Sequence, residues 1–176
     1  MSRASRILLS VTRNLRILVA YDGAKFFGWQ RQDGFDSVQQ ALEEAIESLT
    51  GEPVTVRGSG RTDTGVHALG QVANFHLDTH LDDNRLWHAL NAHLREGVTV
   101  RAMRTAEPEF HAQKSARGKR YAYVIELGRF RSPFGVGRAA FVRGDLDLER
   151  MRAGARHLVG EHDFTSLASA GSPRAS

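Results

Sequence analysis

The sequence contains no cysteine and no hydrophobic run close to the roughly 20 residues that a membrane-spanning helix needs. The absence of cysteine excludes a disulfide scaffold, a thiol nucleophile, an iron–sulfur cluster and a zinc site with cysteine ligands. It is compatible with a reducing compartment, and we expect a cytoplasmic protein. GxxxxGK[ST] and a GxGxxG between a strand and a helix are also absent, so a nucleotide cofactor is not indicated.

The histidines do not show the spacing of a metal site. There are 8 of them, and His76 and His80 are four residues apart in a stretch that reads as strand and loop rather than helix. Neither an HExxH motif nor a cluster of carboxylates accompanies them. We therefore expect no metal and no other cofactor.

Lysine is scarce, and arginine supplies almost all of the positive charge. The net charge is +4 overall, but it is −2 over residues 1–88 and +6 over residues 89–176. Residues 101–131 hold eight Lys and Arg against three Glu. The simple explanation for the excess of arginine over lysine is genomic base composition, and the simple explanation for the basic segment 101–131 is a solvated charged face. The functional explanation is a phosphate-binding surface, because one guanidinium group can donate hydrogen bonds to two oxygens of a phosphate at once.

The chain is long enough for one domain or two small ones, and its 41% hydrophobic and 25% charged residues are those of a folded protein. Alternation predicts strands over 14–22, 53–58, 70–77 and 98–104. Helical spacing predicts helices after Ser37, with Gln40 completing a capping box, and after Asp82 or Asp83, closed by Gly97. This order is that of a split βαβ, ferredoxin-like fold, with one antiparallel sheet and its helices on one face.

After Pro108 the pattern begins again. We predict strands over 119–127 and 138–142 and a helix that begins at Asp145 or Asp147 and is closed by Gly160. We therefore expect an α+β protein with three parts. These are a basic N-terminal arm (1–13), a ferredoxin-like domain (14–107) and an incomplete second unit of the same kind (108–176).

The segment GSGRTDTGVHALGQV, residues 58–72, is the strongest candidate for a functional loop. Asp63 lies there between two predicted strands, beside an arginine and among glycines that allow a ligand to approach the backbone. By spacing alone, an aspartate in such a loop is more often a turn former that caps its own backbone.

Five segments occur in an order that carries further information. They are YDGAKFFGWQRQ (21–32), SVQQALEEAI (37–46), GRTDTGVHALGQVANF (60–75), FHAQKSARGKRYAY (110–123) and GEHDFTSL (160–167). Together they closely resemble the tRNA pseudouridine synthase A family, from about Arg16 to Leu167.

The resemblance implies an enzyme that isomerises uridine to pseudouridine in the anticodon stem-loop of tRNA, without metal or cofactor. Asp63 matches the family's catalytic carboxylate, and Arg61 and Tyr121 match active-site residues. Arg61 would fill the space left by a flipped base or grip a phosphate, and Tyr121 would stack on the uracil. From the residues alone, Arg61 can instead pair with Asp63, and Tyr121 can instead be a core aromatic.

Further contacts are expected around these residues. We expect the substrate to be bound also by Gly60, Thr62, Gly65 and His67. We expect RNA contacts, as phosphate contacts or stacking, from Lys25, Trp29, Gln30, Arg31, His111, Lys114, Lys119 and Arg120. The aromatic residues of the first loop, Phe26 above all, can equally anchor that loop in the core.

The sequence departs from the family in two respects. Gln113 stands where the family has an arginine, and family members run much further than residue 176. Their later half carries a helix whose arginine pairs with the catalytic aspartate and a leucine that packs under the base. We therefore expect a truncated or partial chain that binds tRNA weakly without turnover, and whose membership of the family's homodimer is open. The alternatives are an RNA-binding remnant without catalytic activity and a ferredoxin-like module for a small ligand or protein partner.

Overall fold

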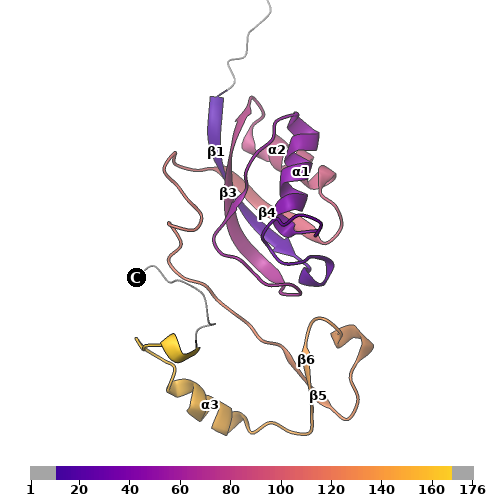
Figure 1. Cartoon of the computed structure of the whole chain (residues 1–176), viewed down its shortest axis with the longest axis vertical. Helices are drawn as coiled ribbons and strands as arrows, with labels where there is room; N and C mark the ends of the chain where they lie inside the picture. Colours follow the sequence, from indigo (N-terminus) through magenta and orange to yellow (C-terminus); the bar gives the residue numbers. More distant parts are fainter. Residues whose placement is uncertain (1–10, 168–176) are drawn as a thin grey trace, which may run out of the picture. The chain divides into compact units, whose positions relative to one another are not determined.

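The computed structural model describes residues 11–167, which form two compact units, one up to Ala122 and one from Tyr123 (Figure 1). In the first unit the order is β1 (Val11–Tyr21), η1 (Gly23–Lys25), α1 (Val38–Thr50), β2 (Arg57–Gly58), β3 (Ala68–Thr79), α2 (Asp83–His93) and β4 (Val98–Thr105). A basic arm is predicted over 1–13. Its residues 1–10 lie outside the described residues, and residues 11–13 belong to β1.

The four strands of the first unit form one sheet in the order β2-β3-β1-β4, and each neighbouring pair is antiparallel. Both helices cover the same face of this sheet (Figure 1). The predicted α+β class is therefore confirmed. The strand predicted over 53–58 is shorter than expected, because only Arg57 and Gly58 pair with β3.

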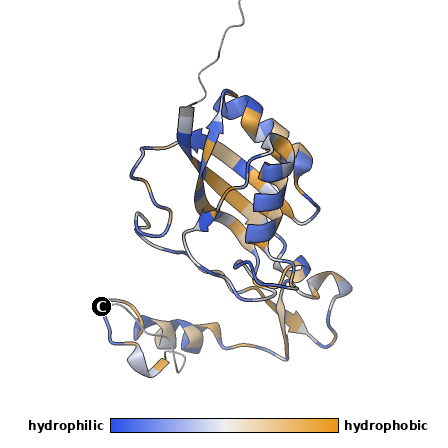
Figure 2. Ribbon diagram, turned by 45° about the horizontal axis from the view of Figure 1, so that its top comes forward, coloured by the Kyte–Doolittle hydropathy of each residue, from blue (hydrophilic) through white to orange (hydrophobic). Residues whose placement is uncertain are grey.

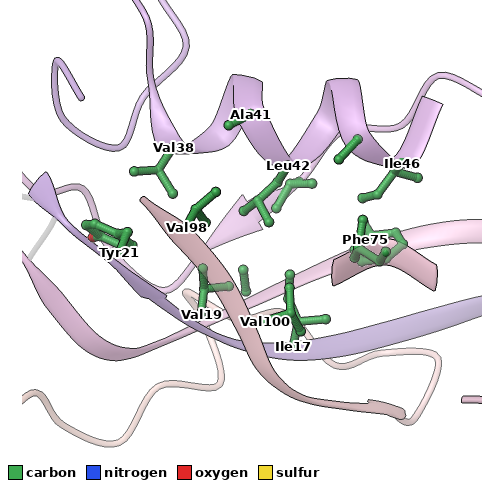
Figure 3. Close-up of a cluster of buried hydrophobic side chains, with 14 of the residues drawn as sticks. Ile17, Val19, Tyr21, Val38, Ala41, Leu42, Ile46, Phe75, Val98 and Val100 are labelled. Carbon is green, nitrogen blue, oxygen red and sulfur yellow. The ribbon is translucent and has the colours of Figure 1, made fainter. Parts of the chain in front are cut away.

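Alternation along β1 decides which side of the sheet is buried. Leu15, Ile17, Val19 and Tyr21 are buried under the helices, together with apolar residues of α1 such as Leu42. Figure 3 shows Ile17, Val19 and Leu42 meeting between α1 and the strands, and Figure 2 shows the hydrophobic strands beneath the helices. Removing this apolar surface from water supplies the main stabilisation of the first unit.

Short-range signals set the ends of the helices. The Ser37 hydroxyl accepts a hydrogen bond from the Gln40 N–H at 3.2 Å, as predicted. The Gln40 side chain instead donates to Glu44 at 2.7 Å, so the reciprocal half of the capping box is not made. Asp82 caps α2 by accepting from the Arg85 N–H at 2.9 Å, and α2 ends at His93, before Gly97.

Two buried asparagines tie the chain after β4 to the sheet face that the helices leave open. The Asn14 amide donates to the carbonyls of Glu107, Pro108 and Phe110. The Asn74 amide donates to Asn14 Oδ1 at 2.9 Å, and Asn74 Oδ1 accepts from the Ala112 N–H at 2.9 Å. Residues 107–112 therefore cross the open face and pack with the first unit.

The second unit is small and has no buried residue among positions 123–167. It contains β5 (Ile125–Gly128), η2 (Pro133–Gly135), β6 (Ala140–Arg143), α3 (Leu148–Arg156) and η3 (Thr165–Leu167), and β5 pairs with β6 in parallel. The strand predicted over 119–127 begins only at Ile125, because no strand pairs with the residues before it. The predicted closure of the last helix at Gly160 is also wrong, since α3 ends at Arg156.

Within residues 11–167, every helix is too short or too polar to cross a membrane.

Candidate active site

Residues 59–67 form the loop between β2 and β3, and two hydrogen bonds to β3 fix its first residues. The Ser59 N–H donates to the Val72 carbonyl at 2.8 Å, and the Gln71 side chain donates to the Gly60 carbonyl at 2.9 Å. At the tip, the Val66 N–H donates to the Asp63 carbonyl at 3.1 Å, closing a turn in which Gly65 has φ 81°. That positive φ explains the glycine at position 65.

The first loop of the chain packs directly against this turn. The Trp29 N–H donates to the Thr62 carbonyl at 3.0 Å. A Cβ at Gly28 would lie 2.6 Å from the same carbonyl, and one at Gly58 would lie 2.5 Å from the Trp29 ring. Close backbone approach therefore requires these two glycines.

Tyr21, the last residue of β1, contacts Thr62 through its hydroxyl group. Its hydroxyl oxygen lies 2.8 Å from Thr62 Oγ1, and its ring is buried beside Trp29. Burial raises the pKa of Tyr21, the hydrogen bond with Thr62 lowers it in part, and Tyr121 adds a further increase. The hydroxyl is therefore protonated at neutral pH and can hold Thr62 in place.

Asp63 and Arg61 flank Thr62, and both are exposed. No ion pair joins them within the part of the chain that the structure describes. The loop therefore presents a carboxylate to solvent on a turn that is fixed at the neighbouring residue. Such a carboxylate can act as a nucleophile or as a general base.

His67 lies at the far end of the loop, against the turn that follows β1. Its Nδ1 is 3.1 Å from Asp22 Oδ1 and 3.2 Å from the Gly23 N–H, which donates to it. A Cβ at Gly23 would lie 2.2 Å from the Val66 carbonyl oxygen. His67, predicted to bind substrate, thus also connects the end of the loop to residues 22–23.

The segment after Ala112 returns to the loop. Lys119 Nζ lies 2.5 Å from where a Cβ of Gly60 would be, so the ammonium group rests over this glycine. Tyr121 is close enough to Tyr21 to raise its pKa, and its side chain is 67% exposed. Lys119 and Tyr121, which are far from Gly60 in sequence, are thus brought to the Asp63 loop.

The other residues expected to contact RNA are placed differently. Trp29 is 3% exposed and Gln30 is half-buried, whereas Lys114 and Arg120 are exposed. Lys25 pairs with Glu96, and Arg31 pairs with Glu43 at 3.0 Å, which raises the pKa of Arg31. His111 Nδ1 accepts from the N–H groups of Gln113 and Lys114, so it closes a turn.

Sequence reasoning missed Tyr21 and Gln71 as supports of the loop. Their polar groups lie on strands whose alternation predicted only core or sheet positions. No signal in the sequence linked Tyr21 to Thr62, because 41 residues separate them. Across positions 11–167, no three side chains among His, Asp and Glu come together as metal ligands would.

Comparison with known proteins places this fold and loop in a family. The sequence model of the tRNA pseudouridine synthase family matches residues 17–113, more than half of the chain, including the second half of β1, the Asp63 loop and β4. The chain belongs to the tRNA pseudouridine synthase family.

Individual relatives agree with this assignment. Proteins named tRNA pseudouridine synthase A from Acetivibrio thermocellus, Agrobacterium fabrum and Neisseria meningitidis serogroup B are 41%, 47% and 44% identical to the chain, over 91%, 88% and 88% of its length. The chain spans 66%, 59% and 58% of the lengths of these three relatives.

Proposed function

We propose that the protein acts on tRNA and converts uridine to pseudouridine, with Asp63 as the essential carboxylate. The observation that carries this proposal is the placement of Asp63. It is exposed on a turn that Trp29 and Tyr21 fix through the adjacent Thr62. Membership of the family and the identity to proteins named for this activity support it.

The reaction is an isomerisation, so its atoms balance within the nucleotide. The C1′–N1 glycosidic bond breaks, the uracil turns, and a C1′–C5 bond forms. The C5 proton passes to solvent, and N1 takes up a proton. One carboxylate can serve by attack on the ribose, by attack on the ring or by proton abstraction from the sugar.

Arg61 and Tyr121 complete the proposed site. A uridine inside a stem or loop has to leave its stack before Asp63 can reach it. We propose that the exposed Arg61 guanidinium fills the space that the base vacates or binds the adjacent phosphate. We propose that the exposed Tyr121 ring stacks on the uracil. The pocket around the base would be shaped by Gly60, Thr62, Gly65 and His67.

The remaining parts of the proposal concern fold, substrate and setting. We propose that the first sheet is the split βαβ, ferredoxin-like arrangement, and its antiparallel β2-β3-β1-β4 order supports this. We also propose the anticodon stem-loop as the target, a homodimer as the assembly of the intact protein, and the cytoplasm as its location.

One observation favours a second candidate, RNA binding without turnover, for the 176 residues as they stand. Asp63 has no cationic partner in residues 11–167. A carboxylate that is to remain charged in a pocket filled by a base needs one. The exposed lysines and arginines would still support binding.

Tritium release from tRNA labelled at uridine C5 tests the first proposal, with RNA binding measured in parallel. Asp63→Asn should abolish release and leave binding intact, whereas the control Asp78→Asn, at an exposed strand position, should change neither. Substantial release by Asp63→Asn would refute the role of Asp63.

The same assay separates the two candidates. Binding without release by the unaltered 176 residues would support the second candidate for this chain. The asparagine substitution would then be made at the matching aspartate of the longer Agrobacterium fabrum relative.

A further inference from the structure

Glu43 is a buried carboxylate that the proposed reaction does not use. It lies on α1, is 6% exposed, and is next to the apolar residues of this helix that face the sheet. Figure 3 shows two of these, Leu42 and Ile46, between α1 and the strands. A charged side chain loses its hydration when it is buried, so protein groups have to replace the lost water. The partners of Glu43 therefore indicate why a carboxylate stands here.

Both carboxylate oxygens of Glu43 accept hydrogen bonds from within the protein. Oε2 accepts from the Arg31 guanidinium at 3.0 Å. Oε1 accepts from the Gln39 side chain at 2.9 Å and from the Val56 N–H at 3.0 Å. This one carboxylate thus connects the first loop (residues 22–37), α1 and the segment that leads into β2.

The first loop is attached to the start of α1 through Gln39. The Gln39 N–H donates to the Trp29 carbonyl at 3.0 Å. The first N–H groups of a helix have no partner within the helix, so they are available for such bonds. The Gln39 side chain accepts from the Arg31 N–H at 3.0 Å and at the same time donates to Glu43. Glu43 therefore holds the first loop both directly, through Arg31, and through Gln39.

Trp29 connects the first loop to the candidate active site. It precedes Arg31 by two residues, and its N–H donates to the Thr62 carbonyl at 3.0 Å. Thr62 is the residue before Asp63. The position of the first loop therefore determines where the backbone at Asp63 lies.

The Val56 contact acts on the same site from another segment. Val56 is 1% exposed and precedes Gly58, against which the Trp29 ring packs, by two residues. Only Arg57 and Gly58 pair with β3, so strand pairing alone provides few hydrogen bonds to this segment. The bond from the Val56 N–H to Glu43 thus fixes the residue that directly precedes β2.

Net stabilisation by a buried carboxylate of this kind is small. Its attraction to Arg31 is offset by the loss of hydration, and a well-packed apolar residue in its place is often neutral or better for stability. The Arg31 side chain is 52% exposed, so water also weakens the pair. An apolar residue cannot accept hydrogen bonds from three segments of the chain. The arrangement therefore favours a role in holding these segments in one relative position.

Building on the role proposed above for Asp63, we propose that Glu43 is a positioning residue for the reaction. It holds the first loop and the segment before β2 together, and through Trp29 and Thr62 they fix the Asp63 loop. A reacting group has to be held in place to be effective. Glu43 does not contact the substrate, because donors of the protein itself occupy both of its oxygens.

Amide hydrogen exchange of the 176-residue chain, followed by NMR for individual residues, tests this role without requiring turnover. The test variant is Glu43→Gln, which keeps the shape of the side chain and removes its charge. The control is Glu44→Gln, at the next position of α1, which changes the net charge equally. Glu44 is exposed and accepts from the Gln40 side chain within the same helix at 2.7 Å.

In Glu43→Gln, two N–H groups that hold the Asp63 loop should exchange about tenfold faster, because the loop opens more often without the charged acceptor. These are the N–H groups of Trp29 and Ser59, which donate to Thr62 and Val72. The amides of β1 should stay within about twofold of their original rates, because their opening requires disruption of the core. The control should keep all of these rates.

Arg31→Gln separates the two contacts and keeps the proposal testable if Glu43→Gln fails to fold. The Arg31 side chain is exposed, and its loss removes only the contact with the first loop. The Trp29 amide should exchange faster in this variant, whereas the Val56 amide should keep its rate. An unchanged Trp29 amide would contradict the proposal.

Unchanged exchange at Trp29 and Ser59 in Glu43→Gln would overturn the proposal. Equal acceleration of the β1 amides would overturn it too, since it would show a general effect on stability.

Tritium release from tRNA is scored separately. Absence of release from the unaltered chain counts against turnover by this chain, and the exchange rates then decide on Glu43 alone. Where the unaltered chain releases tritium, Glu43→Gln should lower kcat about tenfold and leave KM within about twofold, because it displaces the reacting group and not the RNA contacts. A raised KM with an unchanged kcat would refute the positioning role.

Discussion

The hydroxyl oxygens of Tyr21 and Thr62 lie 2.8 Å apart, which joins the last residue of β1 to the residue that precedes Asp63. Tyr21 is 4% exposed and belongs to the core, whereas Asp63 is exposed. Through this contact the rigid sheet determines where the proposed catalytic carboxylate stands. Tyr21 is therefore a positioning residue rather than a catalytic one.

Tyr21→Phe removes this hydrogen bond and keeps the ring. We expect the free energy of unfolding to fall by about 1 kcal/mol, the usual net value of one such bond. Tritium release should fall more than RNA affinity, because Asp63 is then less well placed. Tyr123→Phe, at a side chain that is 90% exposed, is the control and should change neither quantity. Unchanged release and stability in Tyr21→Phe would show that the contact does not position the loop.

Stability should depend on Tyr21 at alkaline pH. Burial raises the pKa of its hydroxyl above 10.0, the usual value. The unfolded chain therefore releases this proton first as pH rises. The stability that Tyr21 contributes is full below about pH 10 and is lost as pH rises through the folded pKa. Urea unfolding on both sides of this pH should show a decline that is smaller in Tyr21→Phe, and an equal decline would refute the assignment.

The Asn14–Asn74 pair should matter more for stability than its surface neighbours. Asn74→Ala leaves the Ala112 N–H and the Asn14 side chain without their partner in a buried setting. We expect a loss of about 2–3 kcal/mol in urea unfolding. The exposed Asn84→Ala should stay within about 0.5 kcal/mol. In a double-mutant cycle with Asn14→Ala, additive losses would show that the two side chains do not act as one network.

Local patterns sufficed for the elements of the first unit. The alternation of Leu15, Ile17 and Val19 predicted β1 and its buried side, and Ser37 predicted the start of α1. Periodicity is a property of neighbouring residues, so it can be read without knowing the fold. The extent of β2 could not be predicted in this way, because a strand exists only where another strand pairs with it.

The residues of the candidate site could be predicted from the sequence, but the contacts that hold them in place could not. The residues 60–75 predicted the loop and Asp63 through resemblance, whereas the Tyr21–Thr62 and Asn14–Asn74 contacts join positions far apart in sequence. The predicted strand over 119–127 failed for a related reason. Its alternating aromatic residues fit a strand, yet Tyr121 has no strand beside it.

Substitutions at Tyr121 should separate its ring from its hydroxyl. If stacking on the uracil is its main contribution, Tyr121→Phe keeps most of the tritium release and Tyr121→Ala loses about tenfold or more, since stacking on one base is worth about 1–3 kcal/mol. Stability should change little in either variant, because the side chain is 67% exposed. Equal losses of release in the two variants would assign the function to the hydroxyl.

Hydrogen exchange should distinguish the two units. Residues 123–167 have no buried side chain, and β5 and β6 pair over only four residues each. We expect their amides to exchange orders of magnitude faster than those of β1 and β3, whose opening requires disruption of the core. The measurement is exchange followed by mass spectrometry of peptides from each unit. Protection of β5 and β6 equal to that of β1 would contradict this expectation.

Asn14 and Asn74 also set a limit on chain length. They fix Ala112 to the sheet, and Tyr121 has to reach the neighbourhood of Tyr21 from there. About nine residues of extended chain reach at most about 30 Å, and here they also contain a turn at His111–Ser115. Over this stretch, insertions and deletions should therefore be rarer than substitutions. Between Ala112 and Tyr121 the chain acts as a tether whose length is set by the two points at which it is held.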